Sequence, residues 1–225
     1  MRKPETVAFD LDGTLVDTLA DLAHATEEVL RRAGLGHMDG SPLHSLEEYR
    51  RYVGNGARRL IERAVGEPAD PAFIDRLLKD FVRIYDRDCL IRSQLYPDIP
   101  EMIAALQERK IRLLVVTNKP EEQALKILRH FFPQHSFDGV CGGRTGRPPK
   151  PDPSALLATL NAAGAKPETA LFVGDSDVDV MTAHHAGLPC AGAVWGFRGK
   201  EELTRAGADA LLYRPLDLLR LLDPG

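Results

Sequence analysis

Short apolar runs alternate with amphipathic stretches along most of the chain. The apolar runs are nearly continuous, as is typical of parallel strands that helices cover on both faces. They predict strands at Thr6–Phe9, Arg112–Thr117, Phe137–Val140, Ala170–Val173, Ala191–Val194 and Ala210–Leu212. The stretches between them have helical spacing and predict helices at Pro100–Arg109, Glu121–Phe131, Pro153–Ala163, Val178–Ala186, Lys200–Ala206 and Leu216–Leu222. This alternation predicts an α/β fold built on a parallel sheet.

One region breaks the alternation. Between Asp17 and Tyr96 the sequence shows only helical periodicity. A purely helical block that follows the first strand of an α/β domain predicts an inserted cap, and Pro97 and Pro100 stiffen the chain at its far end. We therefore expect a catalytic core made of residues 1–17 and 97–225, and a helical cap domain made of residues 18–96.

Length and composition narrow the class of protein. The 225 residues suit one large domain or a domain with an insertion, and a hydrophobic content of 44% excludes disorder. With 29 basic and 33 acidic residues, the chain has no basic field for nucleic acid or acidic lipid. It has no apolar run of the ~18 residues that a membrane span needs. Its three widely spaced cysteines favour a reducing compartment. We expect a cytoplasmic protein that binds neither nucleic acid nor membranes.

Two carboxylates follow the first predicted strand. Asp10 and Asp12 come beyond its carboxyl end, where ligands bind in open parallel sheets, and Gly13 permits a tight turn. Two carboxylates so close together repel each other and need a cation or a shared proton. The alternative is a structural pair in a turn. Chemistry is favoured because other strand ends also carry reactive polar groups.

Two further segments favour an anion. The second strand ends in Thr117 and Asn118 before a helix, so a hydroxyl, an amide and a helix N-terminus together suit a phosphate. Either residue could instead cap the helix. Further along, Lys150 lies between two prolines, which suits a fixed positive charge aimed at an anion. The alternative for this residue is a solvated lysine in a loop.

A second acidic segment follows the strand at Ala170–Val173. Asp175 comes just beyond this strand. Asp179 either takes part in the same site as Asp175 or forms a capping box with Ser176. Carboxylate oxygens near a phosphate site indicate a hard cation, with Mg²⁺ preferred because it keeps waters and accepts a substrate oxygen. The segments at Asp10, Thr117, Lys150 and Asp175 all lie at strand tips of one predicted sheet. Their occurrence together is a much more specific signal for this chemistry than any one of them alone.

These segments resemble the motifs of the haloacid dehalogenase-like hydrolase superfamily, over almost the whole chain. The resemblance rests on Asp10-x-Asp12-Gly13-Thr14-Leu15-x-Asp17, Thr117-Asn118-Lys119, Lys150-Pro151 and Gly174-Asp175-Ser176-x-x-Asp179. It implies a Rossmann-like three-layer core with a parallel sheet. The helical insertion after the first strand matches the C1 type of cap in this superfamily.

The resemblance also implies catalytic roles. Asp10 would be the nucleophile that forms an aspartyl-phosphate, and Asp12 would be the general acid and base. Thr117 and the backbone of Asn118 would hold the phosphoryl group. Lys150 would offset the negative charge of the nucleophile and the phosphate.

The same resemblance implies a Mg²⁺ site. The cation would lie on the carboxylate of Asp10, the backbone carbonyl of Asp12 and the carboxylate of Asp175. Asp179 would be a ligand through water or would orient the other ligands. An Asp at position 12 disfavours the dehalogenase and phosphonoacetaldehyde hydrolase branches, which lack it.

Inside the expected cap, residues 52–60 resemble the glycine-rich cap segment of phosphoglycolate phosphatases. Gly54 and Gly56 could let this loop enter the site and exclude water, and Asn55 or Arg58 could then contact the substrate beyond its phosphate. The alternative is a simple turn between helices. Residues 194–198 also resemble a segment common among these phosphatases, where we expect core packing and loop support.

The resemblance implies a Mg²⁺-dependent phosphatase for a small phosphorylated metabolite, with 2-phosphoglycolate as the first candidate. A sugar-phosphate phosphatase and a β-phosphoglucomutase-like phosphotransferase are alternatives, since the basic segment 142–147 and Asp177-Val178 depart from many relatives. A more distant alternative is a non-enzymatic phosphoacceptor module for signalling. Such receivers lack both the second Asp and an 80-residue cap. The sequence allows a monomer or a homodimer.

Overall fold

The computed structural model describes residues 4–37, 39–66, 69–133 and 136–223, and the chain forms two compact units. The core unit contains residues 1–17 and 95–225, and the inserted unit contains residues 18–94. Strands β2 (Val16–Asp17) and β3 (Gln94–Leu95) pair where the chain leaves the core unit and returns to it. The return falls at Leu95, two residues before the boundary that the prolines indicate.

A six-stranded parallel sheet forms the centre of the core unit, in the order β5-β4-β1-β6-β7-β8. Its strands are β1 (Thr6–Phe9), β4 (Arg112–Pro120), β5 (Gly139–Gly143), β6 (Ala170–Gly174), β7 (Cys190–Ala193) and β8 (Ala210–Leu212). The order of strands reverses on either side of β1. The carboxyl end of β1 is therefore the switch point at which ligands bind in such sheets.

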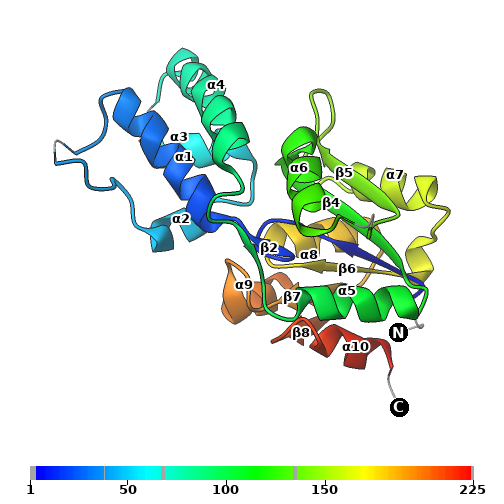
Figure 1. The fold of residues 1–225 in the computed structure, drawn as a ribbon. Coiled ribbons are helices and arrows are strands. Elements are labelled where there is room, and N and C mark those ends of the chain that lie inside the picture. The colour runs from blue at the N-terminus through cyan, green and yellow to red at the C-terminus, as the bar shows by residue number, and fades with distance from the viewer. Residues whose placement is uncertain (1–3, 38, 67–68, 134–135, 224–225) are drawn as a thin grey trace. The chain divides into compact units, whose positions relative to one another are not determined.

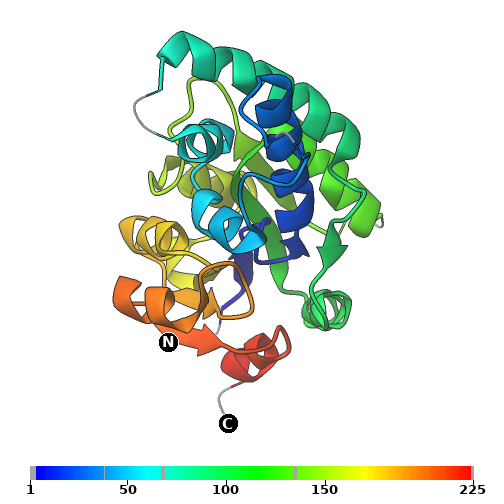
Figure 2. The ribbon, with the colours of Figure 1, turned by 90° about the vertical axis from the view of Figure 1, so that its left-hand side faces the viewer.

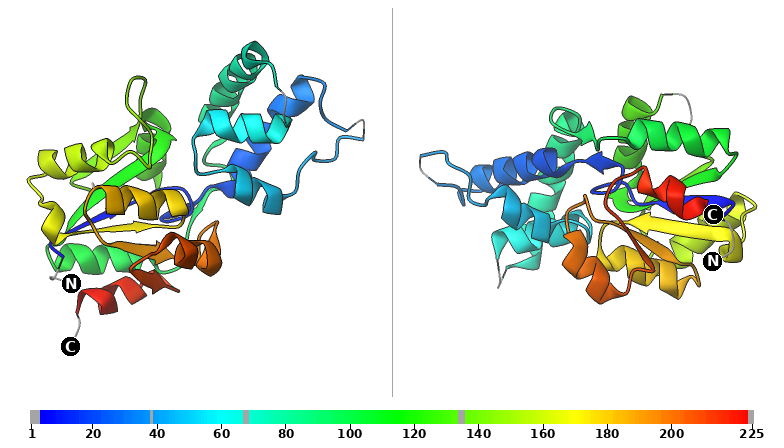
Figure 3. Two further views of the ribbon diagram at one scale, coloured as in Figure 1. Left: turned by 180° about the vertical axis from the view of Figure 1, so that it is seen from behind. Right: turned by 90° about the horizontal axis from the view of Figure 1, so that it is seen from below.

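Helices cover both faces of this sheet, which confirms the predicted three-layer α/β fold (Figures 1 and 3). Alternate strand residues such as Leu114 and Phe172 pack with one group of helices, α7 (Ser154–Ala162), α8 (Asp177–His185) and α9 (Gly199–Ala206). The opposite face carries α5 (Ile99–Glu108), α6 (Glu121–Phe131) and α10 (Asp217–Leu222). A short 3₁₀ helix, η1 (Pro167–Thr169), precedes β6.

The inserted unit is helical, with α1 (Leu19–Arg32), α2 (Leu46–Tyr52), α3 (Ala57–Val65) and α4 (Pro71–Asp88). In Figure 2 the long helix α4 runs alongside α1, against which it packs. Side-chain caps determine where two of these helices begin. Asp70 accepts backbone N–H groups ahead of α4, and Ser45 forms a capping box with Glu48 ahead of α2. Within the described residues, no helix is both long and apolar enough to cross a bilayer.

The ends of several elements differ from the sequence prediction by one to three residues. Helix α7 begins at Ser154 because Pro153 occupies the cap position and Asp152 accepts the Ser154 N–H. Strand β4 continues to Pro120, beyond the predicted end at Thr117, because Pro120 pairs with Gly143 after a shift in register. This extension keeps the polar residues that follow Val116 in line with the sheet.

Candidate active site

Three buried carboxylates meet at the tips of β1 and β6. Asp10 follows β1, and its N–H donates to the Val173 carbonyl at 2.9 Å, so it continues the pairing between the two strands. Asp175 follows β6, and Asp179 lies in the first turn of α8. One oxygen from each carboxylate lies within 4.8 Å of the others. Residues 165 positions apart in the chain thus form one acidic cluster.

Lys150 places a positive charge inside this cluster. Its Nζ lies 2.6 Å from Asp179 Oδ1 and 2.9 Å from Asp10 Oδ1, and the residue is only 4% exposed. Burial alone would lower the pKa of Lys150, but the charges of Asp10 and Asp179 raise it above its ordinary value. The lysine therefore stays protonated.

Asn118 fixes the backbone of Lys150. The Asn118 side chain accepts from Lys150 N–H at 2.7 Å and donates to the Lys150 carbonyl at 3.2 Å. Helix α6 starts without a side-chain cap, so the alternative in which Asn118 or Thr117 caps it is wrong. Thr117 is buried, and its hydroxyl accepts the N–H of Lys119 at 3.2 Å. The tip of β4 thus holds the loop that carries the lysine.

Asp179 organises the tip of β6. Its Oδ2 accepts from the N–H groups of Asp175 and Ser176, each at 3.1 Å, and from the Ser176 hydroxyl at 2.7 Å. The capping interaction with Ser176 is therefore present, and the other oxygen still binds Lys150. A carboxylate with this many partners is suited to orienting its neighbours.

The electrostatics of the site favour a bound cation. Burial raises the pKa of Asp10 to about 6, with a further increase from Asp179 and Asp12, although Lys150 opposes the shift. Burial also raises the pKa of Asp175 well above its ordinary value, as do the charges of Asp179 and Asp10. One lysine does not balance three buried carboxylates, and a divalent cation would make up the difference.

The arrangement of donors fits such a cation. Asp10 Oδ1 is buried, and Lys150 Nζ lies 2.9 Å from it as its ion-pair partner. This atom and the Asp175 carboxylate belong to a set of hard oxygen donors, which Mg²⁺ prefers. The residues present therefore fit Mg²⁺.

The side chain of Asp12 belongs to a separate ion pair. Lys119 Nζ lies 2.9 Å from both carboxylate oxygens of Asp12, and its side chain is 3% exposed. Lys119 belongs to the motif Thr117-Asn118-Lys119, in which the sequence indicated no role for the lysine. The available signal was the two-residue period of a strand, which places Thr117 and Lys119 on the same face at the tip of β4.

The other two predicted contacts lie in the inserted unit. Asn55 is half-buried in the connection between α2 and α3, next to Gly56, whose φ of +85° suits glycine. Arg58 is exposed on α3 and forms ion pairs with Asp75 and Glu62 of the same unit. Exposed pairs of this kind contribute little to stability, so they can exchange partners. Contact of Asn55 or Arg58 with substrate stays a prediction.

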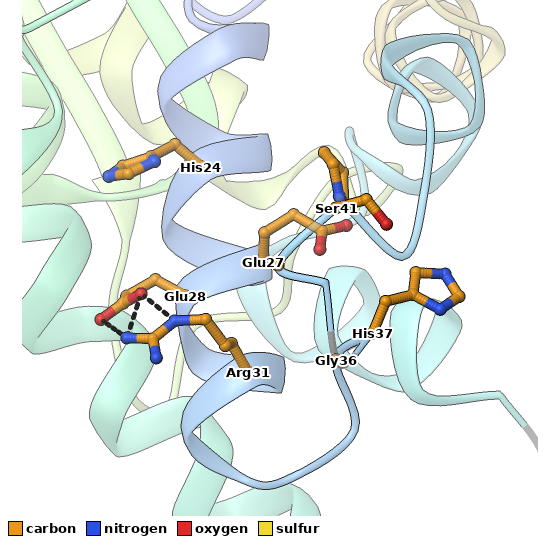
Figure 4. Close-up of a pocket in the computed structure, with 9 residues that line it drawn as sticks. His24, Glu27, Glu28, Arg31, Gly36, His37 and Ser41 are labelled. Atoms are coloured by element: carbon orange, nitrogen blue, oxygen red, sulfur yellow. Dashed lines mark hydrogen bonds and ion pairs between the residues drawn. The ribbon is translucent and has the colours of Figure 1, made fainter.

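The inserted unit also contains a hollow of about 290 Å³ between α1 and the segment that follows it (Figure 4). Its two glutamates already have partners. Glu27 accepts from the Leu43 and His44 N–H groups and the Tyr49 hydroxyl, and Glu28 binds Arg31 and Arg32. Among the described residues, the acidic cluster of the core unit is therefore the stronger candidate for catalysis.

Comparison with known proteins agrees with this geometry. The family model described as haloacid dehalogenase-like hydrolase matches residues 7–193. The chain belongs to this family. Among curated relatives in the family, the phosphoglycolate phosphatase of Aquifex aeolicus is 36% identical over 96% of each chain. That of Pseudomonas putida is 34% identical, over 99% of this chain and 79% of its own.

Solved structures show the same haloacid dehalogenase-like fold. The crystal structure of a predicted phosphoglycolate phosphatase from Haemophilus somnus 129PT aligns with a TM-score of 0.88 and 29% identity, over 99% of this chain and 100% of that one. The resemblance that the sequence motifs indicated is therefore confirmed. The protein is an enzyme of the phosphatase type within this hydrolase family.

Proposed function

We propose that this protein hydrolyses a small phosphomonoester, with 2-phosphoglycolate as substrate and Mg²⁺ as cofactor. The observation that carries the proposal is the acidic cluster of Asp10, Asp175 and Asp179, in which the buried Oδ1 of Asp10 lies 2.9 Å from Lys150 Nζ. The substrate follows from relatives that are named phosphoglycolate phosphatases and are 34 to 36% identical over nearly the whole chain.

In the proposed first step, a carboxylate oxygen of Asp10 attacks phosphorus and the bond to the substrate oxygen breaks. Asp12 donates a proton to the departing alkoxide, so that an alcohol leaves and an aspartyl-phosphate remains. Thr117 and the backbone of Asn118 hold the phosphoryl oxygens. The ammonium group of Lys150 offsets the charge that collects between nucleophile and phosphate.

In the second step, a water molecule attacks the same phosphorus and Asp12 removes its proton. The bond between Asp10 and phosphorus breaks, which releases inorganic phosphate and restores the carboxylate. Lys119 holds the Asp12 side chain by both oxygens between these transfers. One residue thus moves a proton in each direction.

The carboxylates of Asp10 and Asp175 and the carbonyl of Asp12 would hold the Mg²⁺. When bound, the cation neutralises phosphoryl oxygens and helps to align the reacting groups. Asp179 positions Lys150 and the backbone of Asp175 through hydrogen bonds. Asp10, Asp12 and Asp175 would therefore bind the cation, whereas Asp179 would orient its neighbours.

The inserted unit would serve as the cap, with Asn55 or Arg58 contacting the part of the substrate beyond its phosphate. A cytoplasmic location, a monomeric or homodimeric state and the absence of nucleic acid and membrane partners stay predictions from composition. The substrate is a small phosphorylated metabolite in each version of the proposal.

Hydrolysis of p-nitrophenyl phosphate with and without EDTA tests the chemistry. We expect Mg²⁺-dependent release of phosphate by the wild type and loss of this activity in Asp10→Asn, which keeps the size of the side chain and removes the nucleophile. Acid-quenched wild type should carry phosphate on Asp10. Equal rates for the wild type and Asp10→Asn would overturn the mechanism.

A substrate panel tests the specificity. We expect kcat/KM to be highest for 2-phosphoglycolate among phosphosugars, nucleotides and pyrophosphate. A higher value for a sugar phosphate would replace the proposed substrate while leaving the chemistry intact. Formation of an isomerised sugar phosphate would indicate a mutase instead.

A further inference from the structure

The segment that follows β7, residues 194–198, runs beside Asp175. Strand β7 neighbours β6, with Gly192 opposite Gly174 in the register, so the chain that leaves β7 passes the tip of β6. The core packing expected of this segment is present, since Phe197 is buried and Val194 packs against the core. In addition, the segment makes direct contacts with the carboxylate that we assign to Mg²⁺.

Two residues of the segment meet Asp175 through their backbone. The N–H of Phe197 donates to Asp175 Oδ2 at 2.7 Å. At Gly196, a Cβ atom would lie 2.7 Å from Asp175 Cγ, and closer still to Asp175 Cβ and the Gly13 carbonyl oxygen. Since real Cβ atoms do not approach other atoms so closely, only glycine lets the backbone lie against this carboxylate.

A side chain of the segment connects the same carboxylate to the turn after β1. The indole N–H of Trp195 donates to the Thr14 carbonyl at 3.0 Å, and the Thr14 hydroxyl donates to Asp175 Oδ1 at 3.3 Å. Gly13, just before Thr14, is also pressed against Asp175, since its Cβ would lie 2.7 Å from Asp175 Cγ. Asp175 is 2% exposed between these groups.

Both oxygens of Asp175 therefore have donors that the segment supplies directly or holds in place. Phe197 acts on Oδ2, while Trp195 acts on Oδ1 through Thr14. A carboxylate held at both oxygens has a fixed orientation before the cation arrives, and metal affinity depends on such support.

We propose that residues 194–197 are a positioning element for Asp175, and that Gly196 and Trp195 determine how tightly the site binds Mg²⁺. The inference rests on the proposed function, because it takes Asp175 as a ligand of that cation. Neither residue contacts substrate in this account. Their effect reaches the reaction through the orientation of one ligand.

The test measures Mg²⁺ binding to metal-free, full-length protein by isothermal titration calorimetry. We expect Gly196→Ala to weaken binding by about 10-fold or more, as loss of support around a metal ligand typically does. Gly164→Ala is the control: alanine is strained there by a φ of +65°, but its Cβ would enter open space after α7 and would meet no ligand. This control should bind Mg²⁺ as the wild type does.

Trp195→Phe provides a second variant that keeps an aromatic side chain and removes the indole N–H. We expect weaker Mg²⁺ binding here as well, with phosphatase activity restored by excess Mg²⁺, because the ligands themselves are intact. If Gly196→Ala does not fold, the Mg²⁺ affinity of Trp195→Phe tests the inference by itself. Wild-type Mg²⁺ affinity in Trp195→Phe, or in a folded Gly196→Ala, would overturn the inference.

The wild type separates failure of the inference from failure of the proposed function. Trp195 is the one tryptophan of the chain, so its fluorescence reports on the segment when Mg²⁺ is added. We expect the emission to change along the same binding curve that calorimetry gives. A wild type that binds no Mg²⁺ would remove the proposed site and the inference with it. Mg²⁺ binding by the wild type, together with wild-type affinity in both variants, would count against the inference alone.

Discussion

At the scale of single residues, each of the two aspartates that follow β1 forms an ion pair with a different buried lysine. Lys150 pairs with Asp10, and Lys119 pairs with Asp12. A buried carboxylate without a positive neighbour is costly, so each pairing permits the burial of a group that the chemistry requires. The two aspartates can then have different duties although they are only two positions apart.

The ion pair of Lys119 leads to a prediction about leaving groups. In Lys119→Met, Asp12 loses the group that holds both its oxygens, so protonation of the leaving group should become less efficient. We expect kcat/KM for an alkyl phosphate to fall about 10-fold or more, and kcat/KM for p-nitrophenyl phosphate to fall much less, because nitrophenolate leaves without a proton. Lys200→Met, on the exposed surface of α9, is the control. Equal losses for both substrates would contradict the role of Lys119.

The raised pKa of Asp10 leads to a prediction about pH. This pKa is about 6 in the folded protein without metal, against an ordinary value of 3.8, so the folded form retains a proton that the unfolded form loses in this interval. The contribution of Asp10 to the free energy of unfolding therefore falls as pH rises from about 4 to 6, and the full penalty from this group persists above that range. Mg²⁺ competes with this proton and relieves the penalty at higher pH.

We accordingly expect excess Mg²⁺ to raise Tm by about 3 °C or more at about pH 7.5, and by less than half as much at about pH 5. Thermal unfolding of EDTA-treated protein at both pH values provides the measurement, and the variant Asp175→Asn provides a control with a weakened site. A Tm increase from Mg²⁺ that is larger at the lower pH would contradict the assignment.

At the scale of elements, glycines at the ends of strands let the tips converge. Gly174 ends β6, and a Cβ there would lie 2.6 Å from Asp179 Oδ2 and closer to Asp179 Cβ and Cγ. Gly192 is opposite on β7, where a Cβ would lie 3.0 Å from Leu203 Cδ1. The first neighbour is a carboxylate with several hydrogen bonds, whereas the second is the end of a flexible side chain.

This pair of glycines provides matched variants. We expect Gly174→Ala to lower the free energy of unfolding by about 3 kcal/mol, because overpacking there also disturbs buried hydrogen bonds of Asp179. Gly192→Ala should cost about 1 kcal/mol or less, since Leu203 can move. Urea denaturation measures both values. Equal costs at the two positions would show that the hydrogen bonds of Asp179 are not what makes Gly174 necessary.

At the scale of the whole molecule, the chain leaves the core unit after Asp17 and returns at Leu95. All the residues assigned to the nucleophile, the cation and the lysines belong to the core unit, whereas Asn55 and Arg58 belong to the inserted unit. An insertion between β1 and the rest of the sheet therefore leaves the acidic cluster intact. The proposed site for the cation needs one unit only.

Hydrogen exchange tests this division. Added Mg²⁺ should slow amide exchange at the tips of β1, β6 and β7 and in the segment 194–198, because binding stabilises the folded form of these parts. We expect helices α1 to α4 to exchange at unchanged rates when no substrate is present. The full-length protein is used, with Ca²⁺-free buffer and EDTA as the reference state. Protection by Mg²⁺ confined to α1–α4 would place the cation elsewhere.

The sequence by itself determined the elements and the chemical classes of the site. The strands at Thr6–Phe9 and Ala210–Leu212 and the helix at Glu121–Phe131 have the bounds that their patterns predict, since continuous apolar runs and helical spacing are local properties. The carboxylates that follow the strands could also be recognised in the sequence. Parallel strands bring their carboxyl ends to one edge of the sheet, so these carboxylates were expected to lie together.

Only the tertiary structure decided which side chains are partners. Lys119 and Asp12 are 107 positions apart, and Thr14 and Asp175 are 161 apart. Spacing along the chain says nothing about such pairs, because they depend on strand order, register and the close approach that Gly196 allows. The sequence therefore contained the reactive groups, and the packing of β1, β4, β6 and β7 decided how they are held.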